Sequence, residues 1–163
     1  MSVVTFEKQA GASRSMSKQR LRLWLRLLRA PRAIEANLRE RLRVAFHVTL
    51  PQFDVMAALA RKDAGMTMTE LSRYLMVSNG NVTGIIDRLV AERMVARATI
   101  LADRRATMVR LTPRGKSHFA AIAKVHESWV DELLNGFSRK EVETMIGLLD
   151  GFASALRGGG ERP

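Results

Sequence analysis

Two adjacent arginines follow an aspartate at a point where the chain is expected to turn back on itself. The turn is the polar stretch Ala102–Ala106, and the β-like runs on either side of it are Val95–Leu101 and Thr107–Leu111. Guanidinium groups on a narrow hairpin tip can enter a DNA minor groove, where the phosphate walls concentrate negative potential. We therefore expect Arg104 and Arg105 to contact DNA, with Arg104 inserted in the groove. A carboxylate beside phosphates is repelled, so we expect Asp103 to fix the hairpin instead.

A helix-turn-helix is predicted directly before this hairpin. Thr67 and Glu70 have the Thr-x-x-Glu spacing of a capping box, which would open a short helix over Met68–Met76. Ser78 is the expected N-cap of a second helix over Asn79–Glu92. Two short helices joined by a tight corner form the motif, and the hairpin then becomes its wing.

The N-terminal end of the second helix in such a motif enters the major groove. Small amide and hydroxyl side chains suit the reading of base edges, and free helix N–H groups favour a phosphate. The expected DNA contacts from this part of the chain are Thr67, Ser78, Asn79, Gly80, Asn81, Thr83 and Arg88. The alternative is that Asn79–Asn81 form only a polar turn.

The composition limits the classes of protein to be considered. The 163 residues suffice for about one domain, and 27 Lys+Arg against 16 Asp+Glu give a net charge of +11. Such a charge attracts polyanions, whether nucleic acid, an anionic membrane surface or a phosphorylated ligand.

The chain has no cysteine, which excludes a disulfide, a thiolate metal site and a thiol switch. The three histidines lack metal-ligand spacing and no nucleophile or phosphate-loop motif occurs, so no metal, cofactor or enzymatic activity is expected. No apolar run is long enough for a membrane span, and the N-terminus does not resemble a secretory signal; we expect a cytoplasmic protein with no membrane partner.

Helical periodicity dominates the rest of the sequence. The predicted fold is mainly α with a small β wing, in the order of four helices, two strands and two helices. An amphipathic N-terminal helix contains Pro31, where a kink or break is expected. The predicted parts are a flexible arm over 1–16, the N-terminal helix over 17–48, the winged helix-turn-helix lobe over 49–112, two helices over 113–157 and a disordered tail over 158–163.

The ordered set of motifs from about Leu50 to Gly115 resembles the MarR family of bacterial winged-helix transcriptional regulators. The pieces that carry the resemblance are Thr69-Glu70-Leu71, Val77-Ser78, Val82-Thr83, Ile86-Asp87-Arg88-Leu89, Asp103-Arg104-Arg105-Ala106 and Leu111-Thr112-x-x-Gly115. The resemblance implies a homodimer, joined through the first and the last two helices, that binds double-stranded DNA at a pseudo-palindromic operator.

Two positions depart from the family pattern. Arg93-Met94 stands where family members carry Gly followed by Leu before the wing, and Ala102 stands where a Pro is common. A glycine at the first of these positions supplies a left-handed helix end. Replacing it costs on the order of 1 kcal/mol if φ stays positive.

The resemblance further implies a repressor of a catabolic or resistance operon that a small aromatic effector releases from DNA. The N-terminal helix carries an aromatic, an apolar wall and several guanidinium groups, which could hold the acyl group and phosphates of an aryl-coenzyme A thioester. The candidate ligand-binding residues are Trp24, Leu28, Arg32, Phe46, His47, Phe53 and Met56. The alternatives are that the basic face is solvated or pairs with acidic residues of a second subunit, and that Trp24 belongs to a core or an interface.

A basic architectural protein that binds any DNA is the competing class. Charge alone does not separate it from a regulator. A specific regulator prefers its operator to random duplex, typically by a factor of 10³ or more.

Overall fold

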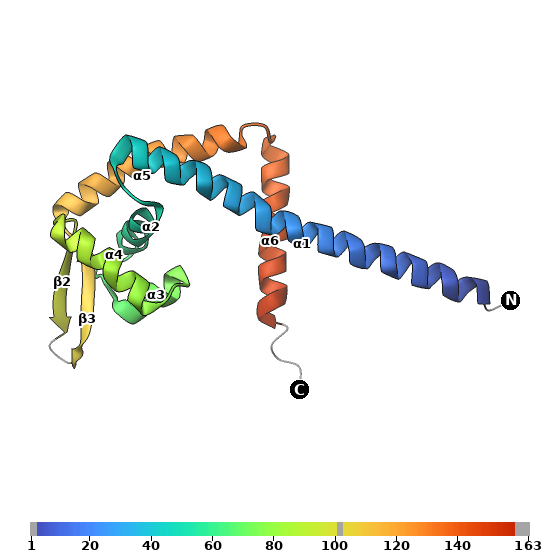
Figure 1. The fold of residues 1–163 in the computed structure, drawn as a ribbon, viewed down its shortest axis with the longest axis horizontal. Coiled ribbons are helices and arrows are strands. Elements are labelled where there is room, and N and C mark those ends of the chain that lie inside the picture. The colour runs from blue at the N-terminus through green and yellow to red at the C-terminus, as the bar shows by residue number, and fades with distance from the viewer. Residues whose placement is uncertain (1–2, 101–102, 159–163) are drawn as a thin grey trace. The chain divides into compact units, whose positions relative to one another are not determined.

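The computed structural model describes the backbone of residues 3–100 and 103–158, and the side chains of residues 15–98 and 107–157. Two compact units are present, Met1–Lys124 and Val125–Pro163. The elements, shown in Figure 1, are α1 (Val3–Phe46), α2 (Leu50–Ala60), β1 (Met66–Thr67), α3 (Met68–Leu75), α4 (Asn79–Ala91), β2 (Val95–Ile100), β3 (Asp103–Leu111), α5 (Pro113–Leu134) and α6 (Arg139–Gly158). This order confirms the predicted mainly α fold with a β wing, and adds the short strand β1.

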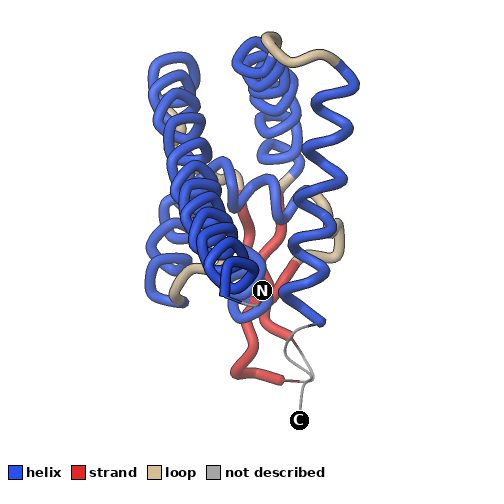
Figure 2. The backbone as a smooth tube through the Cα atoms, turned by 90° about the vertical axis from the view of Figure 1, so that its right-hand side faces the viewer, coloured by secondary structure: helices blue, strands red, loops and turns tan. Residues whose placement is uncertain are grey.

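A three-stranded antiparallel sheet forms one side of the first unit. Its strand order is β1-β3-β2, and Figure 2 shows the strands side by side. The helices α2, α3 and α4 supply most of the core against this sheet. Buried apolar side chains of the unit include Leu42, Val55, Met56, Leu59, Leu71, Val82, Ile86, Leu89, Val109 and Ile122.

Side-chain caps fix where the short helices begin. Thr67 and Glu70 form the predicted capping box at α3, with the Thr67 hydroxyl accepting from the Glu70 amide at 3.2 Å. A second box, which the sequence analysis did not identify, joins Thr49 and Gln52 at the start of α2. Ser78 is the N-cap of α4, as expected, although its side chain makes no capping hydrogen bond.

Helix α1 differs from its prediction at both ends and in the middle. It begins at Val3 and not at Ser17, and it ends at Phe46. Pro31 lies inside the continuous helix, so of the kink or break expected there, the break is wrong. A proline removes one backbone hydrogen bond, whereas each of the other residues still adds one. The helix therefore propagates through the position.

Three helices end on a left-handed residue that is not glycine. The φ angles are +54° at His47, +54° at Met76 and +61° at Arg93. At the end of α4 the Arg93 amide donates to the Val90 carbonyl at 2.9 Å, and the Met94 amide donates to the Leu89 carbonyl at 2.8 Å. These are the two hydrogen bonds of a Schellman motif. The positive φ that the family pattern assigns to a glycine is thus retained at Arg93.

The second unit contains the end of α5 and all of α6. Ser138 and Glu141 form a capping box at the start of α6, with the Ser138 hydroxyl donating to the Glu141 carboxylate at 2.7 Å. Large apolar side chains of α6 are exposed in the single chain: Met145, Ile146, Leu148, Leu149, Phe152 and Leu156. Within the described residues, no helix combines the length and the apolar character needed to cross a bilayer.

Candidate nucleic-acid interface

Helix α4 has two chemically distinct faces. Val82, Ile86 and Leu89 are at most 1% exposed and hold the helix in the core of the first unit. The other side is exposed and polar or small: Asn79, Gly80, Asn81, Thr83, Gly84, Asp87 and Arg88. A helix fixed through one face presents the opposite face in a defined orientation, as recognition of a groove requires.

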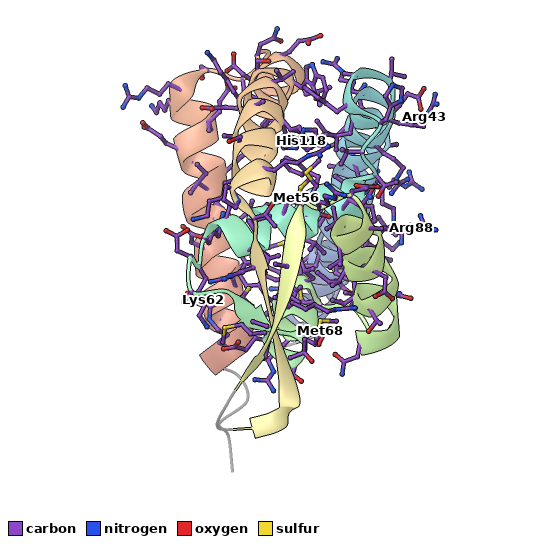
Figure 3. The ribbon with its side chains drawn as sticks, turned by 90° about the vertical axis from the view of Figure 1, so that its left-hand side faces the viewer. Arg43, Met56, Lys62, Met68, Arg88 and His118 are labelled. Carbon is purple, nitrogen blue, oxygen red and sulfur yellow. The ribbon has the colours of Figure 1, made fainter. Side chains whose placement is uncertain are left out.

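Two glycines leave the backbone of this exposed face open. Apart from the neighbouring residues and backbone of α4 itself, no heavy atom lies within 4 Å of the position that a β-carbon would occupy at Gly80 or Gly84. Both glycines line a shallow groove of about 630 Å³ between the start of α2 and the exposed side of α4, which Asn81 and Arg88 also line. Arg88 projects from α4 to the outside of the lobe (Figure 3). Another molecule can therefore approach the helix backbone closely here.

The predicted contact residues around α4 differ in how free their polar groups are. The Thr67 hydroxyl donates to the Glu70 carboxylate at 3.1 Å and accepts from the Glu70 amide, so the capping box uses its only donor and one of its two lone pairs. The Thr83 hydroxyl donates to the Asn79 carbonyl at 2.9 Å, which leaves its oxygen lone pairs on the exposed side. A DNA contact is therefore easier to reconcile with the geometry of Thr83 than with that of Thr67.

The wing hairpin is regular near its base, where it joins the lobe, and irregular near its tip. Val95–Thr99 pairs in register with Thr107–Leu111. The register then shifts, and Ile100 is placed opposite Asp103. The expectation that Asp103-Arg104-Arg105 belongs to the turn is wrong for the backbone, because β3 already begins at Asp103. A local insertion in one strand of a pair bends that strand and redirects its side chains. The side chains of these three residues, and the whole of Ala102, lie outside the described residues.

An ion pair that the sequence analysis missed joins the wing to α4. Arg97 in β2 places its guanidinium 2.7 Å from the Asp87 carboxylate. Asp87 belongs to a motif on α4 that carries the family resemblance, but its partner Arg97 lies on the next element, β2. No periodicity along one element could reveal that pairing.

The base of the wing is also tied to α5. The Thr112 hydroxyl donates to the Arg93 carbonyl at 2.8 Å and accepts from the Gly115 amide at 3.0 Å. Gly115 is buried, and a β-carbon there would lie 2.0 Å from the Met94 carbonyl oxygen. The end of α4, the start of β2 and the start of α5 therefore meet at one closely packed junction.

The seven candidate ligand-binding residues do not converge within one chain. Phe53 and Met56 are buried in the core, where the Phe53 ring lies 5.6 Å from the ring of Phe119. Trp24 is 52% exposed, Leu28 is half-buried and Arg32 is exposed on α1. At the other end of α1, Phe46 is half-buried and His47 is exposed.

The length of α1 decides how these groups can cooperate. Trp24 and Phe46 lie on one continuous helix, which separates them by about 33 Å along its axis at 1.5 Å per residue. A small aromatic molecule can touch only one of the two groups in a single chain.

The electrostatics near the start of α2 disfavour an anion. Partial burial raises the pKa of Asp54, and the nearby carboxylate of Glu35 on α1 raises it further. Two acidic groups, one on α1 and one on α2, thus lie close enough to interact. Among the described side chains, no cluster of three or more His, Cys, Asp or Glu is arranged to hold a metal ion.

Comparisons with known proteins agree on the class of this interface. The MarR family profile matches residues 48–106, from the start of α2 into the wing. The transcriptional activatory protein BadR of Rhodopseudomonas palustris is 35% identical over 98 residues, which cover 58% of this chain and 56% of that protein. The chain thus matches just over half the length of that relative.

Solved structures extend the likeness beyond the lobe. A MarR family transcriptional regulator from Silicibacter pomeroyi is 30% identical with a TM-score of 0.75, covering 86% of this chain and 97% of that one. A mutant MarR from E. coli complexed with operator DNA is 27% identical with a TM-score of 0.72, covering 82% of this chain and 95% of that one. The lobe, its wing and these likenesses together show that the chain belongs to the MarR family of helix-turn-helix transcriptional regulators.

Proposed function

We propose that this regulator is a homodimeric repressor that binds a pseudo-palindromic operator through α4 and the wing, and that a small aromatic ligand releases it. The observation that carries the proposal is the exposed face of α4, where Asn79, Asn81 and Thr83 surround two open glycines. Asn side chains can pair with adenine through two hydrogen bonds, and the open backbone permits a close approach to base edges. The E. coli MarR structure with operator DNA supports the same role for this lobe.

A second copy of the chain would explain the exposed apolar side chains at both ends of the sequence. Leu23 and Trp24 on α1, and Leu149 and Phe152 on α6, are about half exposed in the single chain. Apolar patches of this kind are costly in water and mark interfaces. A two-fold dimer would also present two copies of α4 to half-sites about one helical turn apart, roughly 34–36 Å.

The aromatic ligand is proposed for the apolar part of α1 around Trp24 and Leu28, with Arg32 nearby for an anionic group. The Phe46 end of the helix lies too far away to share a small ligand with Trp24 in the same chain. An aryl-coenzyme A thioester remains the proposed class, because it combines an aromatic acyl group with phosphates that arginines bind.

The first test is a titration of the protein on the DNA upstream of its own gene against a scrambled duplex of the same length. We expect a preference of 10³-fold or more, lost on addition of one member of a panel of aromatic acids and their coenzyme A thioesters. Equal binding to both duplexes that no compound changes would support the architectural class instead. A rise in transcription from that promoter when the protein is added would show that the protein is an activator and not a repressor.

Two variants separate base reading from phosphate binding. Asn81→Ala should reduce the difference in affinity between the operator and the scrambled duplex, because it removes a base contact. Arg104→Ala should weaken binding to both duplexes, because it removes a contact that depends on groove shape and charge. Arg157→Ala on α6 is a charge-matched control and should leave both affinities unchanged. If both test variants lose affinity equally on both duplexes, this division of roles is wrong.

A further inference from the structure

The net positive charge of this protein is concentrated in one segment outside the DNA-reading lobe. Residues 8–34 contain eight Lys or Arg and no Asp or Glu, a charge of +8 out of the total of +11. The rest of the chain has 19 basic and 16 acidic residues and carries only +3. The charge that suggests a polyanionic partner is therefore mainly a property of the first part of α1.

Four of these cations form a single line along α1. Lys18, Arg22, Arg26 and Arg29 follow each other at spacings of four, four and three residues, which place them on one face of a helix. We call these four residues the basic stripe. All four are exposed, and none of the described acidic side chains forms an ion pair with them. The basic stripe extends over ~16 Å of helix, the axial length of about five base pairs.

The basic stripe is unfavourable for the isolated helix. Like charges three or four residues apart on a helix repel each other, and the basic stripe contains three successive pairs of this kind. Elsewhere on the surface arginines are neutralised locally, as Arg43 is by Glu40 at 2.6 Å and Arg139 by Glu143 at 2.8 Å. An uncompensated row of this kind is stabilised by a rigid row of negative charges.

We propose that the basic stripe binds the phosphate backbone of the DNA flanking the operator, as a contact additional to those of α4 and the wing. This inference rests on the proposed function, which brings duplex DNA to the protein. Once the lobe is bound, any flanking duplex within reach of α1 is present at a high effective concentration, so weak phosphate contacts suffice. Arginine, which supplies three of the four cations, makes two-pronged contacts with phosphate oxygens.

The apolar side of the same helix favours DNA over a lipid surface. Leu23, Trp24 and Leu27 lie on the side of α1 away from the basic stripe. Binding to a bilayer would require these side chains to enter the lipid, and they would then be lost to the proposed dimer. Binding to phosphates uses the basic stripe alone. One helix can therefore pair with a second copy through one side and contact DNA through the other.

The test compares two duplexes that share the same protected sequence, found by footprinting the DNA upstream of the gene. The short duplex ends at the edges of the protected sequence, and the long one continues for about twelve base pairs on each side. The variant is Arg22→Gln/Arg26→Gln/Arg29→Gln, because glutamine keeps helix propensity and removes charge. The matched control is Arg39→Gln/Arg114→Gln/Arg157→Gln, which removes three exposed charges elsewhere. Circular dichroism checks that the helix content of both proteins is unchanged.

On the long duplex, the variant should bind at least about tenfold more weakly than the wild type at 0.1 M salt. Six lost phosphate contacts per dimer should lower the slope of log K against log salt by about 5. On the short duplex the variant should match the control. The preference of the wild type for the protected sequence over a scrambled one tests the proposed function separately. If the wild type shows no such preference, the dissociation constants of the variant and the control can still be compared on scrambled duplexes of both lengths. Their ratio then tests the basic stripe.

Three results would overturn the inference. The first is wild-type affinity of the variant on the long duplex. The second is a loss of affinity by the variant that is equal on both duplex lengths, or an equal loss of affinity by the matched control. Either result would make net charge the cause. The third is unaltered DNA binding together with co-sedimentation of the wild type, but not the variant, with phosphatidylglycerol vesicles. That result would assign the basic stripe to a membrane surface.

Discussion

Replacing Arg93 by glycine should stabilise the protein, although arginine is the natural residue. Arg93 ends α4 with a φ of +61°, and its side chain is exposed. A residue with a β-carbon loses about 1–2 kcal/mol in this conformation. Glycine removes that strain but adds about 0.5–1 kcal/mol of chain entropy to the unfolded state. The Schellman hydrogen bonds use backbone atoms only, so the substitution keeps them. The expected net gain is about 0.5–1 kcal/mol.

Urea unfolding at a fixed protein concentration measures this gain. With a slope of about 2 kcal/mol per molar urea, the midpoint should rise by roughly 0.3–0.5 M. Arg93→Ala is the matched control, because it removes the guanidinium and keeps the β-carbon, and its midpoint should not rise. An equal rise in both variants would assign the effect to charge. An unchanged or lower midpoint for Arg93→Gly would refute the argument from backbone strain.

Three further substitutions follow from the same structure. Gly115→Ala should cost about 3 kcal/mol or prevent folding, because its β-carbon would lie 2.0 Å from the Met94 carbonyl oxygen; thermal unfolding measures this. Gly84→Ala meets no neighbour and should instead raise stability by about 0.5–1 kcal/mol, while gel-shift titration should show weaker operator binding. Hydrogen bonds from Thr67 and Lys62 lower the pKa of Glu70 from 4.5 to about 2, so its contribution to stability is present above pH 4.5 and is lost as the pH falls towards 2. Glu70→Gln should therefore be less stable than the wild type at pH 7, and urea midpoints that stayed equally far apart at pH 2 would contradict this.

Local signals in the sequence located the helix-turn-helix well. The spacing of Thr67 and Glu70 predicted the start of α3, because a capping box involves residues within one turn. Ser78 predicted the start of α4, although its side chain makes no capping hydrogen bond. At Arg93, where the family pattern has a glycine, the left-handed helix end is kept with a φ of +61°. Each of these features depends on neighbours in the chain, which a single sequence displays directly.

Features that depend on distant residues were not accessible in this way. The ion pair of Arg97 with Asp87 joins two elements, and the short strand β1 exists only because β3 is available to pair with it. The break considered at Pro31 does not occur, because the long helix on both sides outweighs the local loss of one hydrogen bond. The proposed ligand residues were grouped by chemical type, and the length of α1 then separated them.

The uneven charge of the chain has a practical consequence at different ionic strengths. At about 0.15 M salt the Debye length is about 8 Å, roughly half the length of the basic stripe. The field of α1 is therefore short in range and acts only on partners that already touch the helix. In dilute buffer at about 0.01 M salt the range grows to about 30 Å, and the same segment attracts any nucleic acid in solution. Preparations made at low salt will then carry bound nucleic acid, and a wash near 1 M salt is the condition that removes it.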